Sequence, residues 1–75
     1  MPNYQQRITS SPEVLSGKPV VKGTMISVQL ILTRLAEGAT VEWLLEAWPH
    51  LSREDVLSAM AYAASVVVHE EMLVV

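Results

Sequence analysis

Glycines and lysines are concentrated in residues 17–28, which read GKPVVKGTMISV. Lysine among glycines is what a phosphate-binding loop uses, because backbone N–H groups and an ammonium group surround the anion. The order is wrong for such a loop, since Lys22 precedes Gly23 and Pro19 removes an N–H donor. The stretch is typical instead of a stiffened β-element, in which Gly17 and Gly23 permit tight turns and two lysines project outward.

Cationic side chains could contact DNA phosphates, which supply much of the affinity of DNA-binding proteins. The candidates for this role are Arg7, Lys18, Lys22, Arg34 and Arg53. Residues 1–34 carry a net charge of +3, whereas residues 35–75 carry −6. This asymmetry indicates two surfaces for two kinds of partner. Ordinary solvated charge gives the same distribution, so both interpretations stay open.

Catalytic and metal-binding patterns are not found in the sequence. His50 and His69 are 19 residues apart and the chain has no cysteine, a spacing that does not favour a metal site. Ser52 has no partner for nucleophilic catalysis and is better explained as a helix cap. We therefore predict a protein that is not an enzyme and needs no cofactor.

A small β-element and three helices must position these residues. We expect one domain over residues 1–75, with a β-element at 7–26, a three-helix unit at 27–64 and a tail at 65–75. Short strands are predicted at Arg7–Ile8–Thr9 and at residues 19–22. Ser27, Thr40 and Ser52 are predicted N-caps, and each precedes apolar residues at helical spacing. The apolar residues at this spacing are Val28, Ile31, Leu32 and Leu35 in the first helix, and Val41, Leu44, Leu45 and Trp48 in the second.

The third helix is predicted to be buried on most sides. Val56, Met60 and Val67 belong to one apolar face, and Leu57 belongs to a second. A chain of 75 residues without disulfides is marginally stable alone, so we expect a homo-oligomer, a dimer or higher. The expected interface residues are Trp43, Leu57, Ala61, Val66, Val67, Val68, Met72 and Leu73. The state of the tail is left open, although three consecutive valines favour a strand.

The predicted fold class is mainly α: a helix-turn-helix unit of homeodomain-like type, with a short N-terminal β-element and a C-terminal association tail. In a helix-turn-helix the second helix of the pair enters the major groove. Here that helix begins with Arg53 beside Glu54 and Asp55, and phosphates repel carboxylates. DNA reading by this helix is therefore only weakly indicated. The apolar runs are shorter than the roughly 20 residues of a membrane span, and we expect a cytoplasmic protein that does not use a membrane.

The order of motifs resembles the family known as domain of unknown function 433. The resemblance rests on Arg7–Ile8, Pro12, GKPVVKGTMISV, and LAEGATVEWLLEAWPHLSREDVLSAMAYAA, which together cover about residues 7 to 64. It implies an antitoxin of the VapB kind that neutralises a PIN-like ribonuclease toxin and binds operator DNA as a dimer. The family commonly has arginine after Gly–Thr, where this chain has Met25. The alternative is an oligomeric protein-interaction module that does not bind DNA.

Overall fold

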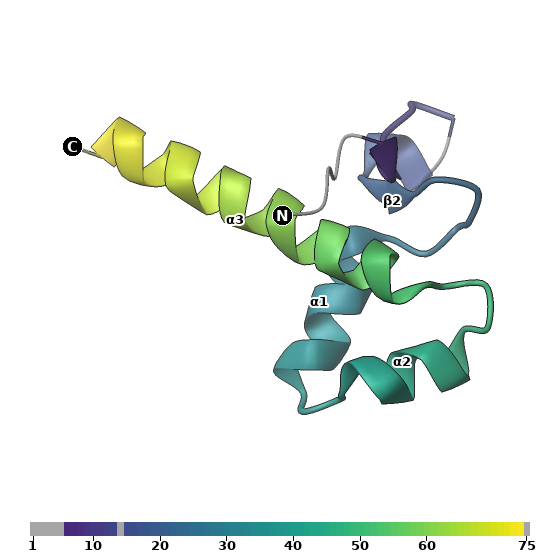
Figure 1. Ribbon diagram of the computed structural model, residues 1–75. Helices are drawn as coiled ribbons and strands as arrows, with labels where there is room; N and C mark the ends of the chain where they lie inside the picture. The colour runs from purple at the N-terminus through teal and green to yellow at the C-terminus, as the bar shows by residue number, and fades with distance from the viewer. Residues whose placement is uncertain (1–5, 14, 75) are drawn as a thin grey trace.

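The computed structural model has three helices and a two-stranded β-element, so the prediction of a mainly α fold is confirmed (Figure 1). It describes residues 6–13 and 15–74, and the side chains of the last helix up to Val68. The elements in chain order are β1 (Ile8–Thr9), the short 3-10 helix η2 (Leu15–Gly17), β2 (Val20–Val21), α1 (Val28–Ala36), α2 (Val41–Ala47) and α3 (Arg53–Val74).

The two predicted strands pair antiparallel, with Ile8 opposite Val21 and Thr9 opposite Val20. The Lys22 N–H extends the pairing by donating to the Arg7 carbonyl at 2.7 Å. Two strands of two residues are barely stable alone in water. Burial of Ile8 and Val21 in the core shared with the helices supplies the missing stability.

The predicted caps fix the starts of α1 and α2. The Ser27 hydroxyl accepts the Leu30 N–H at 3.0 Å, and the Thr40 hydroxyl accepts the Trp43 N–H at 3.0 Å. Each bond satisfies one of the N–H groups that a helix leaves without a partner in its first turn. After α1 the chain turns at Gly38, whose φ of +103° is readily adopted only by glycine.

The start of α3 is held by a reciprocal capping box. The Ser52 N–H donates to the Asp55 carboxylate at 3.0 Å, and the Asp55 N–H donates to the Ser52 hydroxyl at 3.1 Å. The other carboxylate oxygen of Asp55 accepts from Arg7 at 3.1 Å. One buried carboxylate therefore caps α3 and ties it to the residue that precedes β1.

We predict that Asp55→Ala lowers the free energy of unfolding by about 2 kcal/mol, because it removes a cap and leaves Arg7 without its partner. Glu37→Ala is the control, since Glu37 makes an exposed pair with Arg34, and such pairs contribute about 0 to 1 kcal/mol. Urea unfolding of both variants measures the difference. Equal effects of the two substitutions would contradict the structural role given to Asp55.

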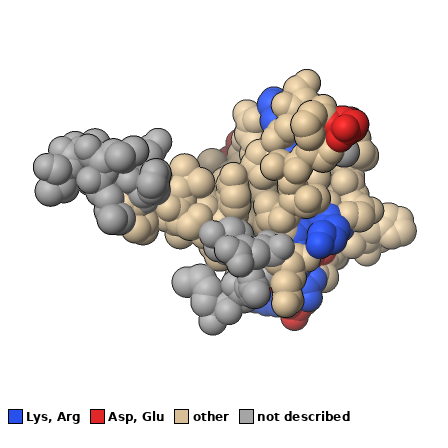
Figure 2. Space-filling model, turned by 90° about the horizontal axis from the view of Figure 1, so that it is seen from above, with Lys and Arg blue, Asp and Glu red and all other residues tan. Residues whose placement is uncertain are grey.

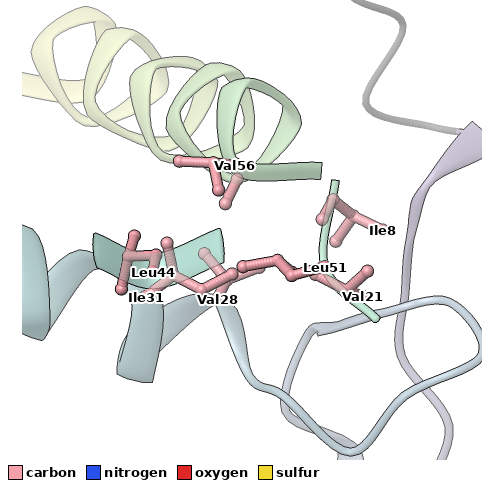
Figure 3. Packing of buried hydrophobic residues seen from close by; sticks show 8 residues of the cluster. Ile8, Val21, Val28, Ile31, Leu44, Leu51 and Val56 are labelled. Carbon is pink, nitrogen blue, oxygen red and sulfur yellow. The ribbon is translucent and has the colours of Figure 1, made fainter. Parts of the chain in front are cut away.

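The core lies where α3 crosses the other elements. Its buried members are Ile8, Val21, Val28, Ile31, Leu44, Leu51, Val56 and Ala59. Figure 3 shows Val56 of α3 above the cluster, with Ile31 and Leu44 side by side and Leu51 between Val28 and Val21. The loop residue Leu51 thus joins the helical part of the core to the β-element.

The face of α3 that packs on the core differs from the sequence-based assignment. Val56 is buried as predicted, but Met60, assigned to the same face, is 39% exposed. Ala59 and Ser58 are buried in its place. Ala61, expected at an interface with another chain, is buried within this chain, so that prediction is wrong. The small residues at 58, 59 and 61 allow α3 to lie close to the core.

The tail continues α3 as far as Val74, so the preference for a strand in its three valines is wrong. β-branched residues disfavour a helix by only a few tenths of a kcal/mol each, and a helix already formed upstream adds one hydrogen bond per residue. In Figure 1 this part of α3, coloured yellow-green to yellow, projects beyond the other elements. The side chains of Met72 and Leu73 lie outside the described residues. Among the described residues, no helix has the length and apolar character needed to cross a bilayer.

Candidate protein-binding site

The five predicted DNA-contacting cations do not form one free basic surface. Three of them make ion pairs within the chain: Arg7 with Asp55 at 3.1 Å, Arg34 with Glu37 at 3.0 Å, and Arg53 with Glu42 at 3.9 Å. Lys18 and Lys22 are exposed on either side of β2, and neither has an ion pair among the described residues. The lysines therefore remain the cations most available to a partner.

The turn after β2 is fixed by its own hydrogen bonds. The Thr24 hydroxyl donates to the Val21 carbonyl at 2.8 Å and accepts the Ile26 N–H at 3.0 Å. The Val21 N–H donates to the Ile26 carbonyl at 2.9 Å, and the Thr24 N–H donates back to the Val21 carbonyl at 3.0 Å. Gly23 adopts a φ of +83° at the tip. These N–H groups are already bonded, so the turn does not present them to a phosphate.

This turn meets the segment after α2 and leaves a hollow of about 260 Å³ between them. Its lining residues are Gly23, Thr24, Met25, Ile26, Trp48, Pro49 and His50. The volume is slightly below the roughly 300 to 1,000 Å³ of typical small-molecule sites. An open, mainly apolar hollow of this size suits one large apolar side chain of another protein.

One exposed apolar residue lines the hollow, and a second meets the ring of a lining residue. Met25, in its lining, is 65% exposed, and Trp43 of α2 is 48% exposed. The Trp43 ring meets the Trp48 ring edge-on, with centroids 6.4 Å apart and planes at 79°. We call Met25, Trp43, Trp48 and the hollow the apolar patch. Exposed tryptophan and methionine are enriched at protein interfaces, which makes this patch the candidate binding site.

The sequence indicated parts of this patch but not the hollow itself. The sequence names Trp43 as an expected interface residue, and the structure places it at the surface, 48% exposed. Trp48, predicted as core, packs against the core but also lines the hollow. The sequence does not predict that residues 23–26 lie next to residues 48–50. Their contact depends on how the β-element packs beside α2. The one available signal is that both segments belong to the motifs of the family resemblance.

Groups for acid–base or metal chemistry do not gather at the patch. In the described part of the chain, no three His, Cys, Asp or Glu residues lie close enough to hold a metal ion. Among the described residues, a shifted pKa is resolved at Glu13, where the Ser11 hydroxyl and the residue's own backbone N–H lower the pKa of the carboxyl. Glu13 is not among the residues that line the hollow.

The remaining predicted interface residues lie on α3. Leu57, Val66, Val67 and Val68 are exposed, as an interface with another chain requires. Met60 is exposed beside them, although the sequence assigned it to the buried face. Figure 2, viewed from above Figure 1, shows mostly uncharged surface on α3 before the grey C-terminal atoms. α3 thus offers a second apolar surface, separate in sequence from the apolar patch.

Comparison with known proteins gives three matches. Residues 8–63 match a family described as protein of unknown function (DUF433). The uncharacterized protein y4eO of Sinorhizobium fredii (strain NBRC 101917 / NGR234) is 46% identical over 56 residues, which are 75% of this chain and 25% of that protein. The crystal structure of a DUF433 member from Anabaena variabilis ATCC 29413 superposes with a TM-score of 0.78 at 30% identity, over 81% of this chain and 60% of that one. This chain therefore spans a quarter of the length of the first relative and about three fifths of the second.

Proposed function

This chain belongs to the DUF433 family, and from that premise we propose that it is an antitoxin that binds and neutralises a PIN-like ribonuclease toxin. The toxin class comes from the resemblance of the family to VapB-type antitoxins. The observation that carries the proposal is the apolar patch, where two motif segments of the family enclose a hollow beside an exposed tryptophan. We infer that the two motif segments together form the site at which the partner binds.

The chemistry of the patch favours a protein partner. Binding hot spots are enriched in tryptophan, and they pair with side chains that fill desolvated pockets. Trp43 is half-exposed at the patch, so a partner that covers it removes apolar surface from water. Each Å² removed stabilises the complex by about 25 cal/mol. The partner would place one large apolar side chain in the hollow and cover Trp43 around it. His50 lines the hollow and supplies a polar group that can fix the orientation of the partner's side chain.

Co-expression tests the proposal. The partner to use is the product of a gene for a small, aspartate-rich PIN-like nuclease beside the gene for this chain. Growth arrest by that nuclease should be relieved by this chain, because an antitoxin must occupy its toxin at cellular concentrations. Absence of such a neighbouring gene, together with no growth rescue by this chain, would contradict the antitoxin function.

Binding of operator DNA is the second candidate function, and the observation that favours it is the pair of exposed lysines beside β2. We predict that a variant with both Lys18→Ala and Lys22→Ala binds promoter DNA more weakly than the wild type, and that the loss is the same whatever the DNA sequence. A plot of the logarithm of its binding constant against the logarithm of salt concentration should also be less steep, as the loss of about two phosphate contacts requires. Electrophoretic shifts with the promoter of its own gene at low and moderate salt measure both quantities.

Arg34→Ala is the control for the lysine variant, since Arg34 is already paired with Glu37. Wild-type protein that does not shift the promoter even at low salt would eliminate autoregulation. That result, together with no growth rescue in the co-expression test, would leave the alternative of an oligomeric interaction module that does not bind DNA.

A further inference from the structure

The outward side of α3 carries a regular apolar stripe. Its residues recur at alternating intervals of four and three, the spacing of a two-stranded coiled-coil seam. The apolar ones are Leu57, Met60, Ala64 and Val67, Arg53 stands one interval before them, and all five residues are exposed. Asp55, Ser58 and Ala59, which lie on the other side of α3, are buried. The helix therefore uses one side for its own fold and leaves a second apolar side without a covering element among the described residues.

The stripe has opposite charges at its two ends. Arg53 stands at its start, where its guanidinium lies only loosely, at 3.9 Å, from Glu42. The next stripe position after Val67 is 71, still within α3, and the sequence has Glu71 there. The side chain of Glu71 lies outside the described residues, and its place in the stripe follows from spacing alone. A basic start and an acidic end complement a second copy that runs in the opposite direction.

We propose that two copies of this chain associate through these stripes, with their α3 helices antiparallel about a two-fold axis near residue 62. This register places Leu57 opposite Val67 and Met60 opposite Ala64 of the second copy. It also places Arg53 opposite Glu71, twice by symmetry. The inference stands independently of toxin or DNA binding, and it specifies the surface, direction and register of the oligomer that the sequence predicts.

The antiparallel direction follows from size and charge. In this register the long Met60 faces the small Ala64, so large and small side chains alternate along the contact. A parallel pair would place Met60 against Met60 and leave a gap between two alanines. It would also bring Arg53 against Arg53 and Glu71 against Glu71, which is unfavourable for like charges. The positions from 53 to 71 span about 27 Å of helix, which is enough for a continuous seam.

Chemical cross-linking tests direction and register together, because the chain has no cysteine of its own. Leu57→Cys and Val67→Cys variants of the 75-residue chain, one carrying an affinity tag, are mixed and treated with a short thiol-specific cross-linker. We expect the mixed product to dominate over either self-linked product. Self-linked Leu57→Cys as the main product would show a parallel pair and overturn the proposal, as would the absence of any dimeric product.

Sedimentation equilibrium tests which side of α3 is used. Val67→Glu should weaken dimerisation at least tenfold, because it places a charge in the seam. Val66→Glu is the matched control, since Val66 is similarly exposed, at 44% against 51%, but lies about 100° around the helix. A monomeric wild-type chain, or equal effects of the two substitutions, would overturn the proposal. Circular dichroism on both variants confirms that they fold.

Discussion

Leu44→Ala is expected to lower the free energy of unfolding by about 3 kcal/mol. Replacing a buried leucine with alanine typically costs about 2 to 5 kcal/mol. Leu44 is fully buried, and its side chain lies beside Ile31 in the core beneath α3 (Figure 3). A domain of this length has a total stability of roughly 4 to 11 kcal/mol. The substitution therefore removes a large part of it.

Thermal unfolding at one fixed protein concentration measures this effect, because self-association makes Tm depend on concentration. A loss of about 3 kcal/mol corresponds to a fall in Tm of roughly 12 to 24 °C for a domain of this size. Leu15→Ala is the control, since Leu15 in η2 is 40% exposed and its truncation removes less buried surface than truncation of Leu44. Similar melting temperatures for the two variants would show that Leu44 is not central to the core.

Trp43→Ala is expected to weaken binding of the PIN-like partner at least 30-fold while leaving the fold intact. A hot-spot residue contributes about 2 kcal/mol or more, which corresponds to that factor in Kd. Trp43 is 48% exposed and lies outside the buried core, so its removal costs the monomer little stability. Val66→Ala is the control, because it truncates an exposed apolar residue on another element.

Met25→Arg separates the two candidate functions. It restores the residue that the family commonly has after Gly–Thr, at a position 65% exposed in the lining of the hollow. If the hollow takes an apolar side chain, the added charge weakens partner binding, because burying it requires a compensating group. If the same face contacts phosphates, the added arginine strengthens DNA binding. Isothermal titration with the nuclease and electrophoretic shifts with promoter DNA measure the two outcomes on one variant.

The local elements could be predicted from sequence because their signals are local. Ser27, Thr40 and Ser52 each cap a helix, and in each case the apolar spacing follows directly. The glycines at 17, 23 and 38 all have positive φ, as turns at those places require. Such features depend on neighbours within a few residues, so a single sequence contains them.

The surfaces could not be predicted in the same way. α3 has apolar residues on both sides, so periodicity alone could not decide whether Met60 or Ala59 faces the core. The side that packs on the core carries the small residues Ser58, Ala59 and Ala61, which let α3 approach the core closely. Likewise, the sequence alone does not show that Arg7, a candidate DNA contact, pairs with Asp55, 48 residues away. Contacts of that kind are set by the tertiary fold.

The central claim is that the apolar patch binds a PIN-like nuclease, and isothermal titration of that nuclease with wild-type protein and the Trp43→Ala variant tests it most directly. We expect saturable binding by the wild type, a Kd at least 30-fold higher for Trp43→Ala, and an unchanged Kd for Val66→Ala. No binding by the wild type, or the same Kd for wild type and Trp43→Ala, would contradict it.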